Sequence, residues 1–335
     1  MERAAVRTDV TKPAITAYKL VGAELELVEK RLQQMLQSAV ELVRQVAGHL
    51  VGSGGKRIRP ALLLLTARMT GADPATGVNL AAATELFHNA SLLHDDVVDR
   101  GHFRRGVAAA PRVYGNSASV LVGDFLLARA LGLVVRHGNQ ELTEALSEIM
   151  LQMAEGEVLQ LVRSGRVTLA LENYLEVISG KTAGLFSWCA LAGASLGTTE
   201  KKLLDAAAAA GRLFGMIFQI TDDILDYTAP VEQSGKDLAN DLEQGKVTLP
   251  LLMACEDDHQ LLALVEHATM AQPSAELLTE IIQRVRNSRA FGRAKDFADN
   301  YLKELGKTLE TFGDSPFSKA FFELATFVTK RLGSL

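Results

Sequence analysis

Apolar side chains recur along most of the chain at intervals of three and four residues, which places them on one face of an α-helix. No segment alternates apolar and polar residues as a strand does, and the chain has no Asn-Gly or Asp-Gly hairpin turn. The predicted helices cover residues 16–50, 58–71, 76–101, 115–137, 139–163, 171–197, 200–228, 246–256, 274–286, 289–311 and 315–332. Because no linker divides them, we predict an all-α protein with a single large helical domain over residues 1–335. We expect about the first 15 residues to be disordered.

Composition and charge narrow the class of protein. The 335 residues are 48% hydrophobic with a formal net charge of -5, so the chain is globular and lacks the basic excess of a nucleic-acid-binding surface. Two cysteines, Cys189 and Cys255, are too few for a disulfide scaffold and fit a reducing compartment. No run approaches about 18 apolar residues, so we expect no membrane-spanning helix. The N-terminal segment lacks the apolar core of a secretory signal, which favours a cytoplasmic protein.

An acidic motif, D-D-x-x-D, occurs at residues 95–99 and again at 222–226, each time near the end of a predicted helix. Helical geometry brings the first and last carboxylates of each motif to one face, where they repel unless a cation lies between them. Carboxylate oxygens favour hard ions such as Mg²⁺. One copy alone would equally suit a solvated acidic helix end, but two copies with apolar flanks favour facing metal sites that clamp a polyanion. The predicted metal ligands are Asp95, Asp96, Asp99, Asp222, Asp223 and Asp226.

Basic residues near these motifs suggest a second site for a polyanion. A glycine pair precedes Lys56 and Arg59 at a predicted helix start, where backbone N–H groups and positive side chains favour phosphate. His88 lies two helical turns before the first triplet and shares its face. Arg104 and Arg105 follow that triplet and can hold phosphate bidentately. Taken singly, each of these groups could instead be a solvated or packed residue.

Five further polar residues give weaker signals. Lys181 and Thr182 lie in a helix weakened by glycines, which indicates either a kink or close helix packing. Gln219 lies one turn before the second triplet, and Lys236 and Lys246 belong to the polar segment after it. Surface solvation is the alternative explanation for each lysine.

Seven short strings together resemble the trans (E) prenyl diphosphate synthases. They are GGKRIRP at 54–60, HNASLLHDDVVD at 88–99, RRG at 104–106, EGEVLQ at 155–160, GKTAG at 180–184, FQITDDILD at 218–226 and GKVTLP at 245–250. Each string alone is partly generic, but all seven occur in the family's order. In detail the chain looks most similar to bacterial long-chain enzymes such as octaprenyl and decaprenyl diphosphate synthases. One position departs from the family pattern, because Ala239 stands where glycine is usual.

The resemblance implies an isoprenoid-synthase fold around a central cavity, usually in a homodimer. It also implies head-to-tail condensation of isopentenyl diphosphate with an allylic diphosphate such as farnesyl diphosphate. Three Mg²⁺ ions per active site would be held by the six aspartates. The implied allylic diphosphate ligands are Arg104, Lys181, Gln219, Lys236 and Lys246, and the implied isopentenyl diphosphate ligands are Lys56, Arg59, His88 and Arg105. Lys181, Thr182 and Gln219 are the implied catalytic residues, and the last two would stabilise the allylic cation.

The helix before the first triplet is expected to line a product tunnel. In the family, large aromatic residues four or five positions before the first aspartate stop elongation early, whereas this chain has Ser91 and Ala90 there. Phe87 either forms a deeper floor or packs into the core. Thr84 lies 11 residues before Asp95, or about 16 Å along the helix. We therefore expect a long-chain product that supplies a quinone side chain, with a peripheral membrane contact for its release.

Other activities fit less well. A terpene cyclase would not need a second basic group, because it binds one diphosphate, and a head-to-head synthase would use Asp-x-x-x-Asp spacing. A non-catalytic subunit of a heteromeric prenyl synthase would be expected to lose metal-binding aspartates, and all six are present. A farnesyl or geranylgeranyl diphosphate synthase remains the alternative of the same chemistry.

Overall fold

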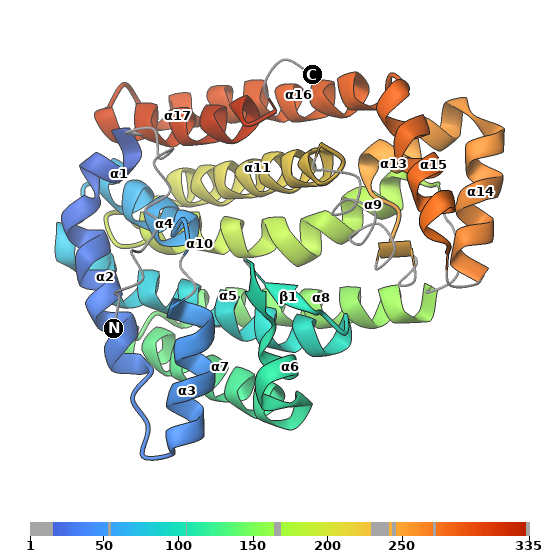
Figure 1. Ribbon diagram of the computed structural model, residues 1–335. Coiled ribbons are helices and arrows are strands. Elements are labelled where there is room, and N and C mark those ends of the chain that lie inside the picture. Colours follow the sequence, from blue (N-terminus) through green and yellow to red (C-terminus); the bar gives the residue numbers. More distant parts are fainter. Residues whose placement is uncertain are drawn as a thin grey trace, which may run out of the picture.

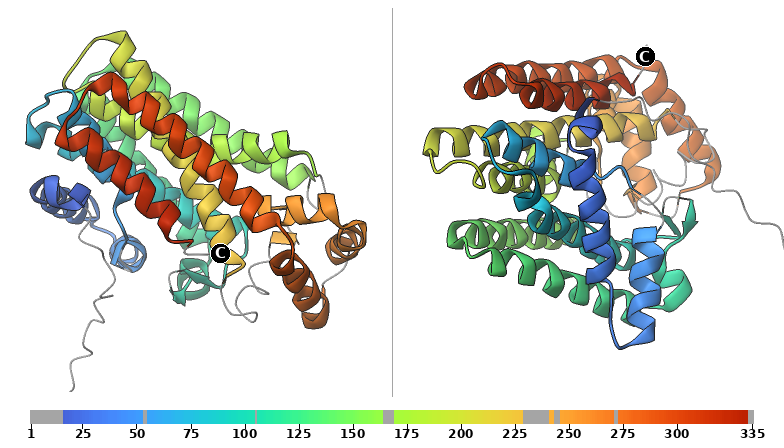
Figure 2. Two further views of the ribbon diagram at one scale, coloured as in Figure 1. Left: turned by 90° about the horizontal axis from the view of Figure 1, so that it is seen from above. Right: turned by 90° about the vertical axis from the view of Figure 1, so that its left-hand side faces the viewer.

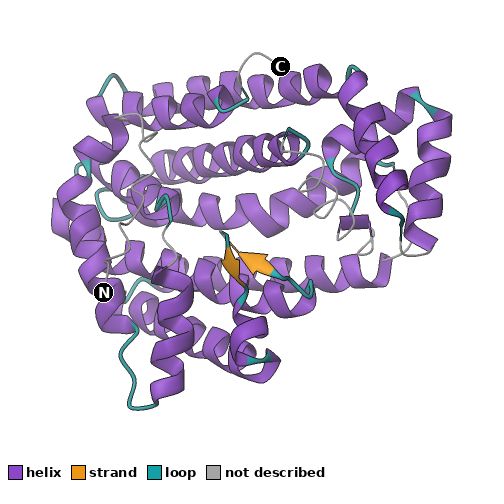
Figure 3. Cartoon of the chain, viewed as in Figure 1, coloured by secondary structure: helices purple, strands orange, loops and turns teal. Residues whose placement is uncertain are grey.

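Helices form almost all of the computed structural model, which describes residues 16–52, 55–104, 106–163, 169–228, 241–242, 246–270 and 273–332 (Figures 1 and 3). The first part of the chain forms α1 (Thr16–Leu20), α2 (Gly22–Met35), α3 (Glu41–Gly52), α4 (Ile58–Met69), η1 (Pro74–Gly77), α5 (Val78–Val98), β1 (Phe103–Arg104), β2 (Val107–Ala108), α6 (Ala110–Tyr114), α7 (Asn116–His137) and α8 (Gln140–Arg163). The second part forms α9 (Leu171–Ile178), the π-helical turn η2 (Ser179–Ala183), α10 (Gly184–Ala194), α11 (Lys201–Asp226), α13 (Leu249–Asp257), α14 (His259–Met270), α15 (Ala275–Asn287), α16 (Ala290–Leu309), η3 (Glu310–Phe312) and α17 (Pro316–Lys330).

The long helices stack in layers around α5, α10 and α11. Helix α5 packs against α7 and α4, α10 packs against α4 and α11, and α11 packs against α16 and α17. Figure 1 shows this order from α7 at the bottom to α16 and α17 at the top. Figure 2 shows α2 standing across one end of the bundle, where it contacts α4 and α5. The predicted all-α class is therefore confirmed.

Small residues allow two of these layers to approach closely. A Cβ atom added at Gly193 of α10 would lie 2.1 Å from the Leu63 carbonyl oxygen of α4. One added at Gly215 of α11 would lie 2.5 Å from the Cα atom of Ala183. Both distances are far below van der Waals contact, so only glycine permits this spacing. The low aromatic content of 6% suits an interior of this kind.

Helix α11 connects the two large clusters of the hydrophobic core. Phe214 and Ile217 belong to the cluster shared with α2, α4, α5 and α7, and Ile220 and Ile224 belong to the cluster shared with α13 to α16. All four side chains are fully buried. Because one face of α11 is buried from Ala207 to Ile224, its C-terminal end and the acidic triplet there have a fixed position within the bundle.

Several predicted boundaries differ from the observed ones. The predicted helix over residues 16–50 is three helices, α1 to α3, because short breaks do not disturb the apolar period. The prediction that the chain has no strand is wrong, because β1 and β2 form a hairpin, shown in orange in Figure 3. Its strands of two residues each are too short to show an alternation of apolar and polar residues. Helices α6 and α14 were not predicted, and η2 interrupts the helix predicted over 171–197. The expected disorder at the N-terminus falls outside the described residues.

Two helices meet length and composition criteria for crossing a membrane. Helices α7 and α11 contain windows with mean hydropathy 1.9 and 1.4, of which 39% and 44% are buried inside the protein. The expectation from sequence counted uninterrupted apolar runs, whereas an averaged window tolerates an occasional charge. Helices in the core of a protein pass the same test, and both helices pack against other helices here.

Candidate active site

The first acidic triplet lies at the C-terminal end of α5. Asp96 is buried with 1% exposure, and the Nε and Nη2 atoms of Arg104 lie 3.0 and 2.5 Å from its Oδ1 atom. The unpredicted hairpin contains this contact, because Arg104 lies in β1, which pairs with β2 across a turn that includes Gly106 with φ +80°. The Oδ2 atom of Asp96 is buried and has no hydrogen-bond partner within the described part of the chain.

The second triplet lies at the C-terminal end of α11. Asp222 accepts a hydrogen bond of 2.8 Å from Nη1 of Arg331, which follows α17. Asp223 is buried and accepts hydrogen bonds from the Tyr174 hydroxyl at 2.6 Å and from Nε2 of Gln219 at 2.8 Å. Burial raises the pKa of Asp223 to about 6, although both hydrogen bonds oppose this shift. Asp226 is exposed.

Side chains of the π-helical turn η2 interact with both triplets. Lys181 forms an ion pair with Glu157 of α8, and its charge also acts on Asp95 of the first triplet. The next residue, Thr182, donates a hydrogen bond of 2.8 Å to Oε1 of Gln219. Gln219 in turn bonds Asp223 of the second triplet. Adjacent residues of one turn therefore interact with both acidic triplets, Lys181 with the first and Thr182, through Gln219, with the second.

The glycine-rich segment around Lys181 shows features of both alternatives, a kink and close helix packing. Residues 179–183 form a π-helical turn, a local irregularity of the kind that the first alternative, a kink, would require. Ala183 also lies against Gly215 of α11 closely enough to exclude any side chain there, which is the predicted close packing.

The surroundings of the triplets disfavour the charged form of the buried carboxylates and favour the charged form of Lys181. Burial raises the pKa of Asp95, against the opposing charge of Lys181. Burial also raises the pKa of Asp222, against the opposing charge of Arg331. For Lys181, burial acts to lower the pKa, but the carboxylates of Asp95 and Glu157 outweigh burial and raise it. Lys181 is therefore a permanent cation at neutral pH.

The other predicted basic residues lie near these carboxylates where the structure describes them. Nζ of Lys246 lies 3.3 Å from both oxygens of Asp99. The charges of Lys56 and Arg59 both act on Asp222, and the Arg59 guanidinium lies 4.4 Å above the ring of Phe186. His88 is half-buried on α5. Arg105, Lys236 and the departure at Ala239 lie outside the described residues.

The residues predicted to set product chain length lie on α5, N-terminal to the first triplet. Thr84, Phe87 and Ala90 are buried, and the last two belong to the main core cluster. Ser91 is half-buried and donates a hydrogen bond of 2.9 Å to the His88 carbonyl. Their role in a tunnel stays a prediction.

Three residues beside the site were not predicted as functional. Glu157 belongs to the string EGEVLQ, which carried a signal but received no role. Tyr174 and Arg331 gave no signal, because their contacts join positions 49 and 109 residues apart. Within the described chain no three potential ligands already converge on one point. Instead, three of the aspartates each form an ion pair with a basic side chain: Asp96 with Arg104, Asp99 with Lys246 and Asp222 with Arg331.

Comparison with known proteins identifies the family. Residues 40–285 match the model of the polyprenyl synthetase family. The chain is 38% identical over 326 residues to octaprenyl diphosphate synthase of Escherichia coli, covering 95% of this chain and 97% of that one. A crystal structure of polyprenyl synthase from Caulobacter crescentus, complexed with calcium and isoprenyl diphosphate, superposes with a TM-score of 0.89 at 36% identity, covering 94% and 97% of the two chains.

A second solved structure is similar over nearly its whole length. Decaprenyl diphosphate synthase from Rhodobacter capsulatus superposes with a TM-score of 0.87 at 31% identity, covering 96% of this chain and 99% of that one. The helical layers are thus those of the isoprenoid-synthase fold that the motifs implied. The chain belongs to the polyprenyl synthetase family and is a prenyltransferase.

Proposed function

We propose that this prenyltransferase is a long-chain trans-polyprenyl diphosphate synthase. It joins isopentenyl diphosphate head-to-tail to an allylic diphosphate, with farnesyl diphosphate as the starting substrate, and its product supplies a quinone side chain. The observation that carries the proposal is the turn η2, whose neighbouring residues Lys181 and Thr182 connect the two acidic triplets. The similarity to octaprenyl and decaprenyl diphosphate synthases supports a long product.

The acidic triplets suit Mg²⁺. All six predicted ligands offer carboxylate oxygens, and Asp96 has a buried oxygen without a hydrogen-bond partner among the described residues. The relative from Caulobacter crescentus was crystallised with calcium, another hard divalent ion. We assign three Mg²⁺ ions to Asp95, Asp96, Asp99, Asp222, Asp223 and Asp226. Bound there, the ions would neutralise the charge of a departing diphosphate.

The chain's own residues would bind and orient the two substrates. Lys181, whose raised pKa keeps it charged, would hold the allylic diphosphate together with Arg104 and Gln219. Lys236 and Lys246 complete this group. Isopentenyl diphosphate would be held by Lys56, Arg59, His88 and Arg105, close to the second triplet.

Condensation then requires no covalent bond to the protein. The allylic carbon–oxygen bond breaks, and the oxygen atoms of Thr182 and Gln219, which are hydrogen-bonded to each other, would stabilise the allylic cation. The double bond of isopentenyl diphosphate attacks this cation and forms the new carbon–carbon bond. The released pyrophosphate takes the proton that restores a double bond. Holding both substrates in register supplies most of the rate acceleration.

We assign the protein to the cytoplasm. The surface of α7 and α8 would suit a homodimer. Leu121 is 66% exposed on α7, and Leu151, Val158 and Val162 are 53%, 60% and 73% exposed on α8. The three α8 residues recur at intervals of seven and four, so they share one face. A second copy would cover this apolar face. A peripheral membrane contact would receive the long product.

The test measures transfer of label from isopentenyl diphosphate into extractable lipid with farnesyl diphosphate, with and without Mg²⁺. We expect Mg²⁺-dependent elongation, and Asp95→Ala should reduce turnover by orders of magnitude while the protein stays folded. Asp314→Ala is the matched control, because that aspartate pairs with Lys319 at the surface. Equal rates for Asp95→Ala and wild type, or elongation in excess chelator, would contradict the metal assignment.

A further inference from the structure

Arg57 has an unusual backbone conformation at the start of α4. Its φ of 50° and ψ of 37° lie in the left-handed region, which non-glycine residues rarely occupy. Its carbonyl oxygen accepts the first hydrogen bond of α4, from the Ala61 N–H group. The residue therefore sets the direction in which the loop enters the helix. A conformation of this kind persists only when surrounding contacts hold it.

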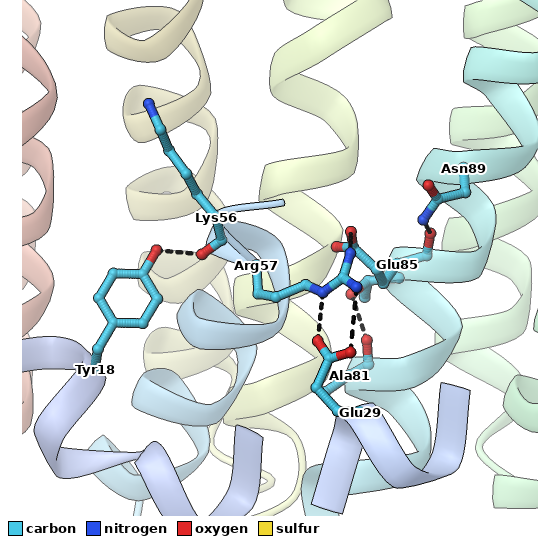
Figure 4. Close-up of polar contacts among 8 residues, drawn as sticks. Tyr18, Glu29, Lys56, Arg57, Ala81, Glu85 and Asn89 are labelled. Atoms are coloured by element: carbon cyan, nitrogen blue, oxygen red, sulfur yellow. Dashed lines mark hydrogen bonds and ion pairs between the residues drawn. The ribbon is translucent and has the colours of Figure 1, made fainter. Parts of the chain in front are cut away.

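The side chain of Arg57 is held by carboxylates from two other helices (Figure 4). Nη1 lies 2.7 Å from Glu85 of α5, and Nε and Nη2 both bond Glu29 of α2, the latter at 3.2 Å. The side chains of Arg57 and Glu85 are only 12% and 4% exposed. Burial acts to lower the pKa of Arg57, but the two carboxylates outweigh burial and raise it. This three-residue clamp of Arg57, Glu29 and Glu85 thus joins three helices through one planar guanidinium group.

The clamp lies among the residues assigned to isopentenyl diphosphate. Arg57 stands between Lys56 and Arg59 in the sequence, and Glu85 precedes His88 by three residues, or one turn of α5. The side chains of Lys56 and Arg57 leave the loop in different directions (Figure 4). The Tyr18 hydroxyl of α1 also donates a hydrogen bond to the Lys56 carbonyl, so a fourth helix helps to fix the loop.

We infer that Arg57 is a positioning residue for isopentenyl diphosphate. Its ion pairs hold the loop and α5 in register, so that Lys56 and Arg59 face the same diphosphate as His88. This inference rests on the proposed function, which assigns those three residues to that substrate. Arg57 itself faces Glu29 and Glu85 and does not contact substrate.

A second arginine–glutamate pair provides a matched control. Nη1 of Arg68, in the last turn of α4, lies 2.9 Å from Oε1 of Glu24 on α2. The two side chains are 27% and 6% exposed, so this pair is also largely buried, and it joins α4 and α2, two of the three helices that the clamp joins. It lies at the other end of α4 from the loop. A purely structural role would make the two pairs equivalent.

The experiment compares Arg57→Lys with Arg68→Lys by steady-state kinetics and thermal unfolding. Lysine keeps the charge opposite Glu85 but lacks the planar fork that also reaches Glu29. We expect the KM for isopentenyl diphosphate to rise about tenfold, because small displacements of binding groups weaken a substrate's binding sharply. The KM for farnesyl diphosphate and kcat should change by less than about twofold. Arg68→Lys should lower Tm without this selective change.

A milder variant covers the case in which Arg57→Lys does not fold. Glu29→Gln removes one charge from a side chain that is 43% exposed, and Glu24→Gln is its control. We expect Glu29→Gln to raise the Kd for isopentenyl diphosphate, measured by calorimetry, by several-fold relative to Glu24→Gln. Equal effects of clamp and control variants on isopentenyl diphosphate would overturn the inference. A wild-type protein that elongates nothing would instead refute the proposed function beneath it.

Discussion

Individual carboxylates at the two triplets differ in what stabilises their charge. Asp96 relies on the Arg104 guanidinium, whereas Asp223 has no ion pair among the contacts described and accepts hydrogen bonds from Tyr174 and Gln219. Neutral donors offset burial less completely than a cation does, and the pKa of Asp223 accordingly rises to about 6. A metal ion competes with protons for such a carboxylate. We therefore expect the tyrosine to matter for metal binding, although it is not a predicted ligand.

Tyr174→Phe tests this role of a hydrogen bond. Losing one donor raises the pKa of Asp223 further, so a larger fraction of the carboxyl is protonated at a given pH and unable to bind metal. We expect the Mg²⁺ concentration for half-maximal activity to rise about tenfold, with a larger effect at pH 6 than at pH 8.

Tyr114→Phe is the control, since that ring packs on His49. An unchanged Mg²⁺ requirement in Tyr174→Phe at both pH values would show that this bond does not support the metal site.

Among the elements, the helices that carry the two triplets were predicted more accurately than the segments that connect them. The apolar period placed both triplets at helix ends, because α5 and α11 are long and largely buried. The hairpin that carries Arg104 escaped notice, since strands of two residues have no periodicity. The contact of Arg331 with Asp222 spans 109 residues, and no local pattern encodes such a pairing. The glycines around Lys181 marked the π-helical turn without distinguishing a kink from close packing.

Gly215→Ala tests the contact between α11 and the π-helical turn. The new Cβ would lie 2.5 Å from Ala183 Cα and 2.9 Å from its Cβ, so the turn that carries Thr182 must move. Overpacking of this kind costs about 1–3 kcal/mol of unfolding free energy, and we expect lower activity as well.

Gly292→Ala, in α16, is the matched control. Nothing lies within 4 Å of an added Cβ there, and alanine should stabilise the helix by about 0.5–1 kcal/mol. Denaturant titration compares the two variants, and equal stability would contradict the packing argument.

At the scale of the whole molecule, net charge proved to be a poor guide to the local charges of the site. A net charge of -5 conceals a site in which Lys56, Arg59 and Arg331 all act on Asp222. The helical class followed from the sequence because periodicity repeats over hundreds of residues. The arrangement of layers did not, because it depends on close approaches such as that of Gly193 to Leu63.

Small residues on α5 are expected to bound the channel that holds the proposed long product. The most direct measurement is the chain length of the product formed from farnesyl diphosphate, labelled isopentenyl diphosphate and Mg²⁺, resolved by reversed-phase chromatography. We predict a product of eight to ten isoprene units, as in the octaprenyl and decaprenyl relatives. Ser91→Phe should shorten it, and Ser91→Ala should not. A wild-type product of farnesyl or geranylgeranyl length, or the same length from Ser91→Phe as from wild type, would contradict the account.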